Sequence, residues 1–63
     1  MCLSNVYQDE QSEDHLLASD VATIESDGGM VTLTDLFGRK LAVKGLLKRA
    51  DLVGGVVILQ VDP

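Results

Sequence analysis

The close spacing of turn residues is the feature that most restricts how this chain can fold. Glycine-containing turns stand at "SDGG" (26–29), "LFG" (36–38) and "LVGG" (52–55), and the apolar runs between them are short. Such runs leave little room for helices of ordinary length. They are also rich in β-branched residues, which favour strands. The spacing therefore predicts an all-β fold.

The clearest predicted hairpin flanks the "SDGG" turn. The stretches 21–25 ("VATIE") and 30–35 ("MVTLTD") are rich in strand formers, and the second alternates cleanly between apolar and polar residues. Val31 and Leu33 should therefore face the core, and the threonines between and after them should face solvent. The two glycines supply the positive-φ positions that a tight hairpin turn requires.

The remaining apolar stretches also favour strands, with one ambiguity. The predicted strands are residues 2–7, 39–45 and 56–61, of which the last is a β-branched run expected to be well buried. Residues 46–53 ("LLKRADLV") fit either a further strand or a short helical turn. Residues 8–15 ("QDEQSEDH") are polar and acidic and predict an exposed loop, which could recognise a basic partner.

Five to six short strands joined by tight turns predict a small antiparallel barrel or rolled sheet, SH3-like or Sm-like, because closing the sheet removes exposed edges. With 63 residues, the chain is long enough for one such domain, spanning 1–63. A domain of this size has a thin core and needs a disulfide, a metal or a partner subunit for comfortable stability. One cysteine cannot form an internal disulfide, which leaves a metal, an oligomer or both.

The charges are unevenly distributed along the chain. The net charge is −5, and eight of the ten acidic residues precede residue 39. All five basic residues fall within 39–49: Arg39, Lys40, Lys44, Lys48 and Arg49. We expect this basic stripe to be solvated or to meet the acidic half of the same or a second chain. An alternative is a small RNA-binding or protein-interaction barrel that uses the stripe, although the acidic balance and the presence of only two aromatic residues disfavour nucleic acid.

Several classes of function lack the residues they need. The chain has one histidine, His15, and one cysteine, so an intrachain His/Cys metal cage cannot form. The carboxylates of Glu10 and Glu13 lie in a polar segment that is not expected to be buried, which disfavours acid/base catalysis, and no phosphate-binding loop is present. We therefore expect a protein that is not an enzyme. No apolar run is long enough for a membrane span, and the N-terminus lacks the basic flank and apolar stretch of a signal peptide. With a lone thiol, we expect a protein of the reducing cytoplasm.

The single cysteine, Cys2, stands next to the N-terminus. Its ordinary interpretation is a small apolar residue on an edge strand. Its position also allows a second interpretation, because the thiolate there has a main-chain amine or amide nearby. Sulfur and nitrogen donors of this kind suit a square-planar ion such as Ni(II) or Cu(II). If Met1 is retained, its main-chain nitrogen supplies the amine; if it is removed, Cys2 does.

A symmetric homodimer would supply the donors that one chain lacks. A two-fold interface brings the same patch of both subunits together at the axis, so two Cys2 thiolates could share one ion. The same dimer would thicken the thin core. The stability of so small a domain and the number of ligands that a metal needs therefore both favour a homodimer.

The chain resembles the CooT-type small nickel-binding proteins over essentially its whole length. The likeness is carried by "MCLSNVY" at the start, then by "LLASDVATIE", "VTLTDLFG" and "VKGLLKRADLVGG" ahead of the last apolar strand. The opening Met-Cys-Leu is its most specific part. The resemblance implies a β-barrel homodimer that binds Ni(II) through Cys2 and acts as a non-enzymatic metallochaperone or nickel store. Its implied partner is a nickel enzyme or the maturation machinery of one, such as carbon monoxide dehydrogenase.

Overall fold

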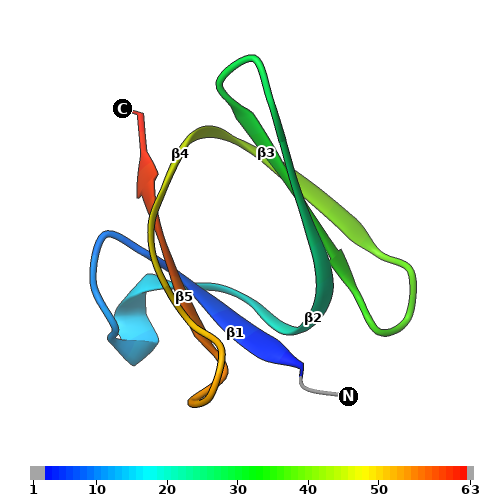
Figure 1. Ribbon diagram of the computed structural model, residues 1–63, viewed down its shortest axis with the longest axis vertical. Helices are drawn as coiled ribbons and strands as arrows, with labels where there is room; N and C mark the ends of the chain where they lie inside the picture. Colours follow the sequence, from blue (N-terminus) through cyan, green and yellow to red (C-terminus); the bar gives the residue numbers. More distant parts are fainter. Residues whose placement is uncertain (1–2, 63) are drawn as a thin grey trace.

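Five strands form a closed barrel in the computed structural model, which describes residues 3–62 (Figure 1). They are β1 (Ser4–Gln8), β2 (Leu16–Asp27), β3 (Met30–Asp35), β4 (Lys40–Asp51) and β5 (Val56–Val61), with one 3-10 turn, η1 (Glu13–His15), before β2. Consecutive strands pair antiparallel. The last strand of a five-stranded meander runs in the same direction as the first, so the closing pair β5–β1 is parallel. The predicted all-β barrel is confirmed.

The core of the barrel is small. Six apolar residues are buried, namely Val6, Val21, Val31, Leu33, Val57 and Leu59. Val31 and Leu33 alternate with the outward threonines of β3, as their spacing predicts. On β5, Val57 and Leu59 alternate in the same way with less buried residues. None of the helical structure in residues 3–62 is long and apolar enough to cross a bilayer.

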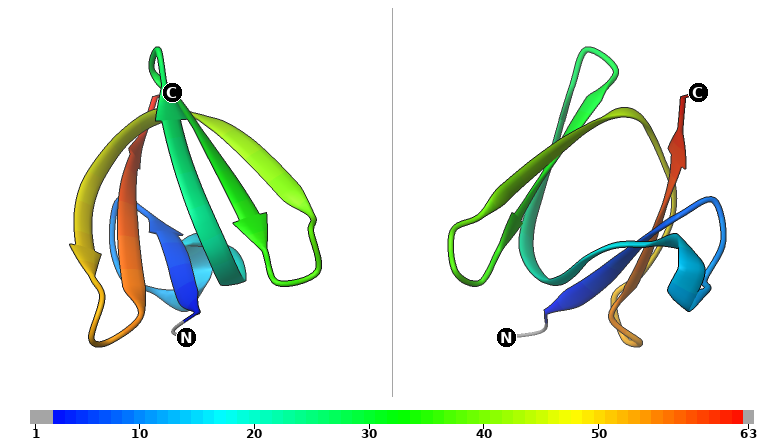
Figure 2. Two further views of the ribbon diagram at one scale, coloured as in Figure 1. Left: turned by 45° about the vertical axis from the view of Figure 1, so that its right-hand side comes forward. Right: turned by 180° about the vertical axis from the view of Figure 1, so that it is seen from behind.

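Strand β2 bends midway, which lets it pair with a different strand along each half of its length (Figure 2). Its first half pairs with β1 and its second half with β3. The bend falls at Asp20, whose φ is 54°, and the buried Val21 that follows pairs with both Ser4 and Asp35. The bend lets a single strand form part of both sides of the barrel.

Strand β4 settles the ambiguity at residues 46–53. The strand runs without interruption from Lys40 to Asp51, so 46–51 continue the preceding strand and form neither a helical turn nor a sixth strand. Gly45 lies inside the strand. A glycine is needed at this position because a Cβ would collide with the carbonyl oxygen of Gln60 on β5. A bulge lies at Lys48, where the pairing with β5 shifts register. The glycine marks a close approach of two strands, and not the end of one.

The close approach at Gly45 predicts a specific sensitivity. Gly45→Ala should lower the free energy of unfolding by about 1 to 3 kcal/mol, because the added methyl group forces β4 and β5 apart. Urea denaturation followed by circular dichroism measures this change. Lys44→Ala, at the exposed neighbouring position, should stay within about 0.5 kcal/mol of the parent. Equal effects at the two positions would contradict the packing described here.

Candidate functional site

The first described residues are fixed at one end of the barrel. The Asn5 N–H donates to the Gly55 carbonyl at 2.8 Å, Ser4 pairs with Val21 on β2, and Val6 is fully buried. Strand β1 is thus hydrogen-bonded on both edges, although it lies close to the start of the chain. The predicted metal ligands, Cys2 and the main-chain nitrogen of Met1, lie outside the described residues, so their role stays a prediction.

The β4–β5 turn lies beside this start of β1. Gly55 has a φ of 71°, and a Cβ there would stand only 3.1 Å from the Leu3 carbonyl oxygen. Asp51 caps the turn, because its Oδ1 accepts hydrogen bonds from the N–H groups of Val53 (3.2 Å) and Gly54 (2.9 Å). Two apolar residues of the capped turn, Leu52 and Val53, directly follow Asp51 and are exposed.

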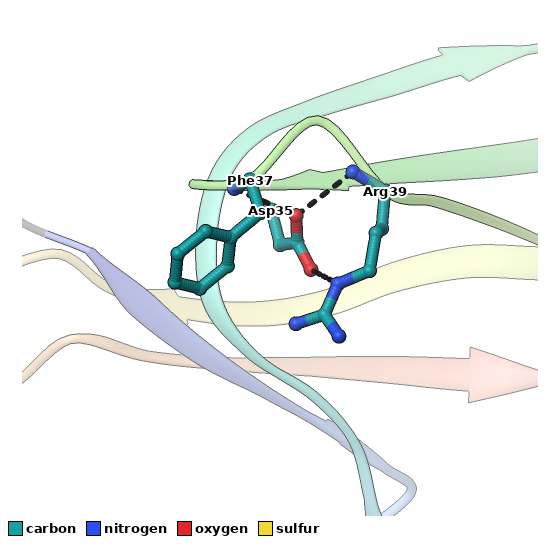
Figure 3. Close-up of polar contacts among 3 residues, drawn as sticks. All are labelled: Asp35, Phe37 and Arg39. Carbon is teal, nitrogen blue, oxygen red and sulfur yellow. Dashed lines mark hydrogen bonds and ion pairs between the residues drawn. The ribbon is translucent and has the colours of Figure 1, made fainter.

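A second aspartate orders the β3–β4 turn (Figure 3). Asp35 Oδ1 accepts hydrogen bonds from the N–H groups of Phe37 and Arg39, each at 2.9 Å, and Oδ2 accepts one from Arg39 Nε at 2.6 Å. The Arg39 guanidinium carbon lies 5.3 Å from the centroid of the Phe37 ring, within cation–π range. The Leu36 N–H donates to the Asp20 carbonyl and attaches the turn to the bend in β2. Leu36 and Phe37 are therefore held in place while largely exposed.

The hydrogen bonds at this turn shift the acidity of Asp35. Desolvation of the carboxyl group acts to raise its pKa. The N–H groups of Arg39 and Phe37 and the Arg39 guanidinium act in the opposite direction, because they stabilise the carboxylate. Their combined effect is larger, and the pKa of Asp35 lies below its ordinary value of 3.8. The turn is therefore most stable when Asp35 is ionised.

The five basic residues of the predicted stripe do not share one environment. Arg39 is bonded to Asp35, and Lys48 Nζ donates to the Asp9 carbonyl at 3.1 Å. Lys40 and Lys44 pair across from Thr34 and Met30 and extend from the outer face of β4, where they are exposed. The stripe thus divides into residues that hold loops in place and residues that remain in solvent.

His15 is more than the exposed loop residue expected from sequence. Its Nδ1 lies 2.8 Å from the Gln8 carbonyl oxygen, to which it can only donate, and its Nε2 lies 3.2 Å from Glu10 Oε1. These contacts close the acidic loop onto the end of β1. Within residues 3–62, no three His, Cys, Asp or Glu side chains are grouped so as to hold a metal ion.

A shallow apolar hollow lies between the first half of β2 and the β3–β4 turn. Leu17, Ala18, Val21, Leu33 and Leu41 line it, with Asp35, Arg39 and Lys40 as its charged lining. Its volume of about 100 Å³ is below the roughly 300 Å³ at which sites for small organic molecules usually begin. The hollow suits a protruding side chain better than a cofactor.

The fold and these surfaces define a small closed β-barrel whose prominent exposed features are ordered turns. A family model described as CO dehydrogenase accessory protein CooT matches residues 1–60, and the chain belongs to the CooT family. The crystal structure of a protein assigned as CooT in Carboxydothermus hydrogenoformans has the same fold, with a TM-score of 0.84 over 98% of this chain and 100% of that chain. The two sequences are 19% identical. A comparison with curated proteins finds no match.

Sequence reasoning did not identify the two capping aspartates. Asp35 and Asp51 each precede a glycine by three residues, and aspartate at the first position of a turn is a recognised signal for such capping. That signal was present in "DLFG" and "DLVG". The exposure of the apolar residues between each aspartate and its glycine was not evident from the sequence, because Leu, Phe and Val ordinarily predict burial.

The ordered β3–β4 turn predicts a pH-dependent contribution to stability. A carboxyl group whose pKa is lowered on folding stabilises the fold fully above its unfolded pKa, and the effect is lost as the pH falls through the folded value. Asp35→Asn should therefore lower the melting temperature at neutral pH, and its difference from the parent should shrink as the pH falls below 3.8. Thermal melts over a pH series measure this, with the exposed Glu25→Gln as control. A difference that stays constant through the acid range would rule out the carboxylate charge as its source.

Proposed function

We propose that this protein is a cytoplasmic, non-enzymatic Ni(II)-binding homodimer that serves as a metallochaperone or nickel store in the maturation of carbon monoxide dehydrogenase. The observation that carries the proposal is the family match, which begins at residue 1 and so includes Met1 and Cys2. Its description as a CO dehydrogenase accessory protein agrees with the role that the resemblance of the N-terminal sequence implies.

The donor chemistry near the N-terminus supports nickel as the cargo. A thiolate with a main-chain amine or deprotonated amide forms a strong-field set of sulfur and nitrogen ligands, which favours square-planar Ni(II). One sulfur and one nitrogen from each of two chains complete four positions. Since Cys2 and the nitrogen must lose protons to bind, affinity should fall as the pH is lowered.

The placement of β1 supports a preorganised site. The strand that follows Cys2 is hydrogen-bonded to β2 and β5, so little chain between Leu3 and the ligands needs to be ordered when metal binds. Ordering fewer groups on binding leaves more of the interaction energy as affinity.

The distribution of apolar residues supports a homodimer. Six apolar residues form the buried core, whereas ten large apolar residues are exposed in the described part of the chain. Scattered exposed apolar residues are normal, but a domain with so few buried ones gains markedly from a partner surface. A two-fold dimer would supply that surface and the second set of ligands together.

Nickel titration of the reduced protein tests the proposed function. Thiolate-to-nickel charge-transfer absorbance should rise and saturate at one Ni(II) per two chains, and Cys2→Ser should abolish it while the circular dichroism spectrum stays unchanged. His15→Ala is the matched control, because it removes the chain's only imidazole, a common nickel ligand, and should leave the absorbance intact. Undiminished nickel affinity in Cys2→Ser would refute the proposal.

A further inference from the structure

Strand β2 has no partner along one edge of its second half. On the side of β1, the pairing stops at Val21, which lies opposite Ser4 at the start of β1. Beyond that point, residues 22–27 pair only with β3 among the strands of residues 3–62. In Figure 1, this half of β2 rises with β3 to the hairpin at the top, away from the N-terminal end of the barrel. We call the side of residues 22–27 that faces away from β3 the open edge.

The register of the β2–β3 hairpin shows which main-chain groups lie along the open edge. The two-residue turn at 28–29 has φ values of 60° and 85°, so the closing pair, Asp27 and Met30, exchanges both of its main-chain hydrogen bonds. Hydrogen-bonded pairs alternate along an antiparallel ladder, so the N–H and C=O groups of Ile24 and Ser26 point away from β3. No other strand pairs with these groups within residues 3–62. A row of such groups is a template for the addition of a further strand.

The side chains of the open edge form an acidic face and an apolar face. Glu25 and Asp27 extend from the outer surface, on the side of the outward threonines of β3, and both are exposed. Ile24 lies on the inner face, opposite the buried Leu33, yet it is 38% exposed. Side chains alternate between the two faces of a sheet, so an added strand would place every second residue beside the carboxylates and the others beside Ile24. The segment that fits therefore alternates basic and apolar residues.

The charges of the open edge favour a different chain over a second copy of this one. Neither Glu25 nor Asp27 forms an ion pair within residues 3–62. Two open edges placed side by side would bring these like charges together, which opposes their pairing. The basic strand β4 of a second copy is not free along its length either. It pairs with β3 on one side, and on the other the Lys44 carbonyl accepts a hydrogen bond from the Asp62 N–H at 2.9 Å.

We propose that the open edge is a docking site for a partner protein, which adds an extended segment of alternating basic and apolar residues to the sheet. The main chain of the segment bonds to Ile24 and Ser26, its basic side chains pair with Glu25 and Asp27, and an apolar side chain packs beside Ile24. The main-chain bonds supply affinity, and the charges supply specificity. The net charge of −5 also favours the approach of a basic segment. This interaction does not involve nickel and goes beyond the proposed function.

An NMR titration of the isotope-labelled, metal-free protein with the peptide acetyl-KVKVK-amide tests the docking site. The amide signals of Ile24 and Ser26 should shift most, because the valines of the peptide bond to these residues. Methylation of both valine main-chain nitrogens removes two donors without a change of charge and should weaken binding by about 10-fold or more. Methylation of two lysine main-chain nitrogens is the matched control, since these N–H groups point away from β2. It should change the affinity by less than about 3-fold.

Charge reversal on the protein tests the acidic face independently. Glu25→Lys combined with Asp27→Lys should weaken peptide binding by about 10-fold or more, because two attractions become repulsions. Glu13→Lys combined with Asp14→Lys is the matched control, since it changes the net charge equally at exposed residues of η1, outside the open edge. It should weaken binding by less than about 3-fold, because screening by salt limits the effect of distant charges. Circular dichroism checks that both variants fold.

Three results would overturn the docking site. The first is the absence of peptide binding, and the second is equal affinity for the two methylated peptides. The third is assembly of the parent into particles larger than a dimer that disperse in the Glu25→Lys and Asp27→Lys variant, which would make another copy of the chain the occupant. Each result is separate from nickel binding. A protein that binds nickel without the peptide refutes only the docking site, and one that binds the peptide without nickel refutes only the proposed function.

Discussion

The parallel pairing of β1 with β5 closes the barrel, and the position of the N-terminal end depends on it. Asn5 to Gln8 pair in register with Val56 to Leu59, and the two strands contribute the fully buried residues Val6 and Leu59. Without this seam, β1 would be an edge strand hydrogen-bonded only to β2, and Leu3 would not be held beside the β4–β5 turn. Closure converts a terminal segment, which frays in many proteins, into a strand held on both sides.

Ordered turns are the second constraint on the surface of the protein. Asp35 and Asp51 cap successive turns by the same means, with a carboxylate oxygen that accepts hydrogen bonds from main-chain N–H groups. Each cap fixes a pair of apolar residues that the small core has no room to bury. Capping and exposure together give this end of the barrel an apolar surface of defined shape near Leu3, the first residue that the structure describes.

The sequence predicted those parts of the fold that depend on local patterns. Alternation placed Val31 and Leu33 in the core, and the paired glycines marked the hairpin turn, although Ser26 and Asp27 of the predicted turn belong to β2 and only Gly28 and Gly29 form the turn. The sequence did not reveal that β4 continues through Gly45. This glycine is required because the main chain of Gln60, fifteen residues later on β5, lies too close to leave room for a Cβ. The parallel pairing of β1 with β5 could not be predicted from local patterns either, because the two strands are far apart in the sequence. For the site, the metal-binding role of Cys2 stays a prediction from its position in the sequence, while the exposed turns beside Leu3 could be seen only in the tertiary structure.

We propose that two chains hold one nickel ion through their N-terminal cysteines. Native mass spectrometry of the reduced protein with a small excess of Ni(II) tests it most directly, because each complex is weighed intact. A shared site should give one dominant species of two chains and one nickel ion, and a Cys2→Ser dimer without bound metal. A dominant species of one chain with one nickel ion, or a Cys2→Ser dimer that retains the ion, would contradict a shared cysteine site.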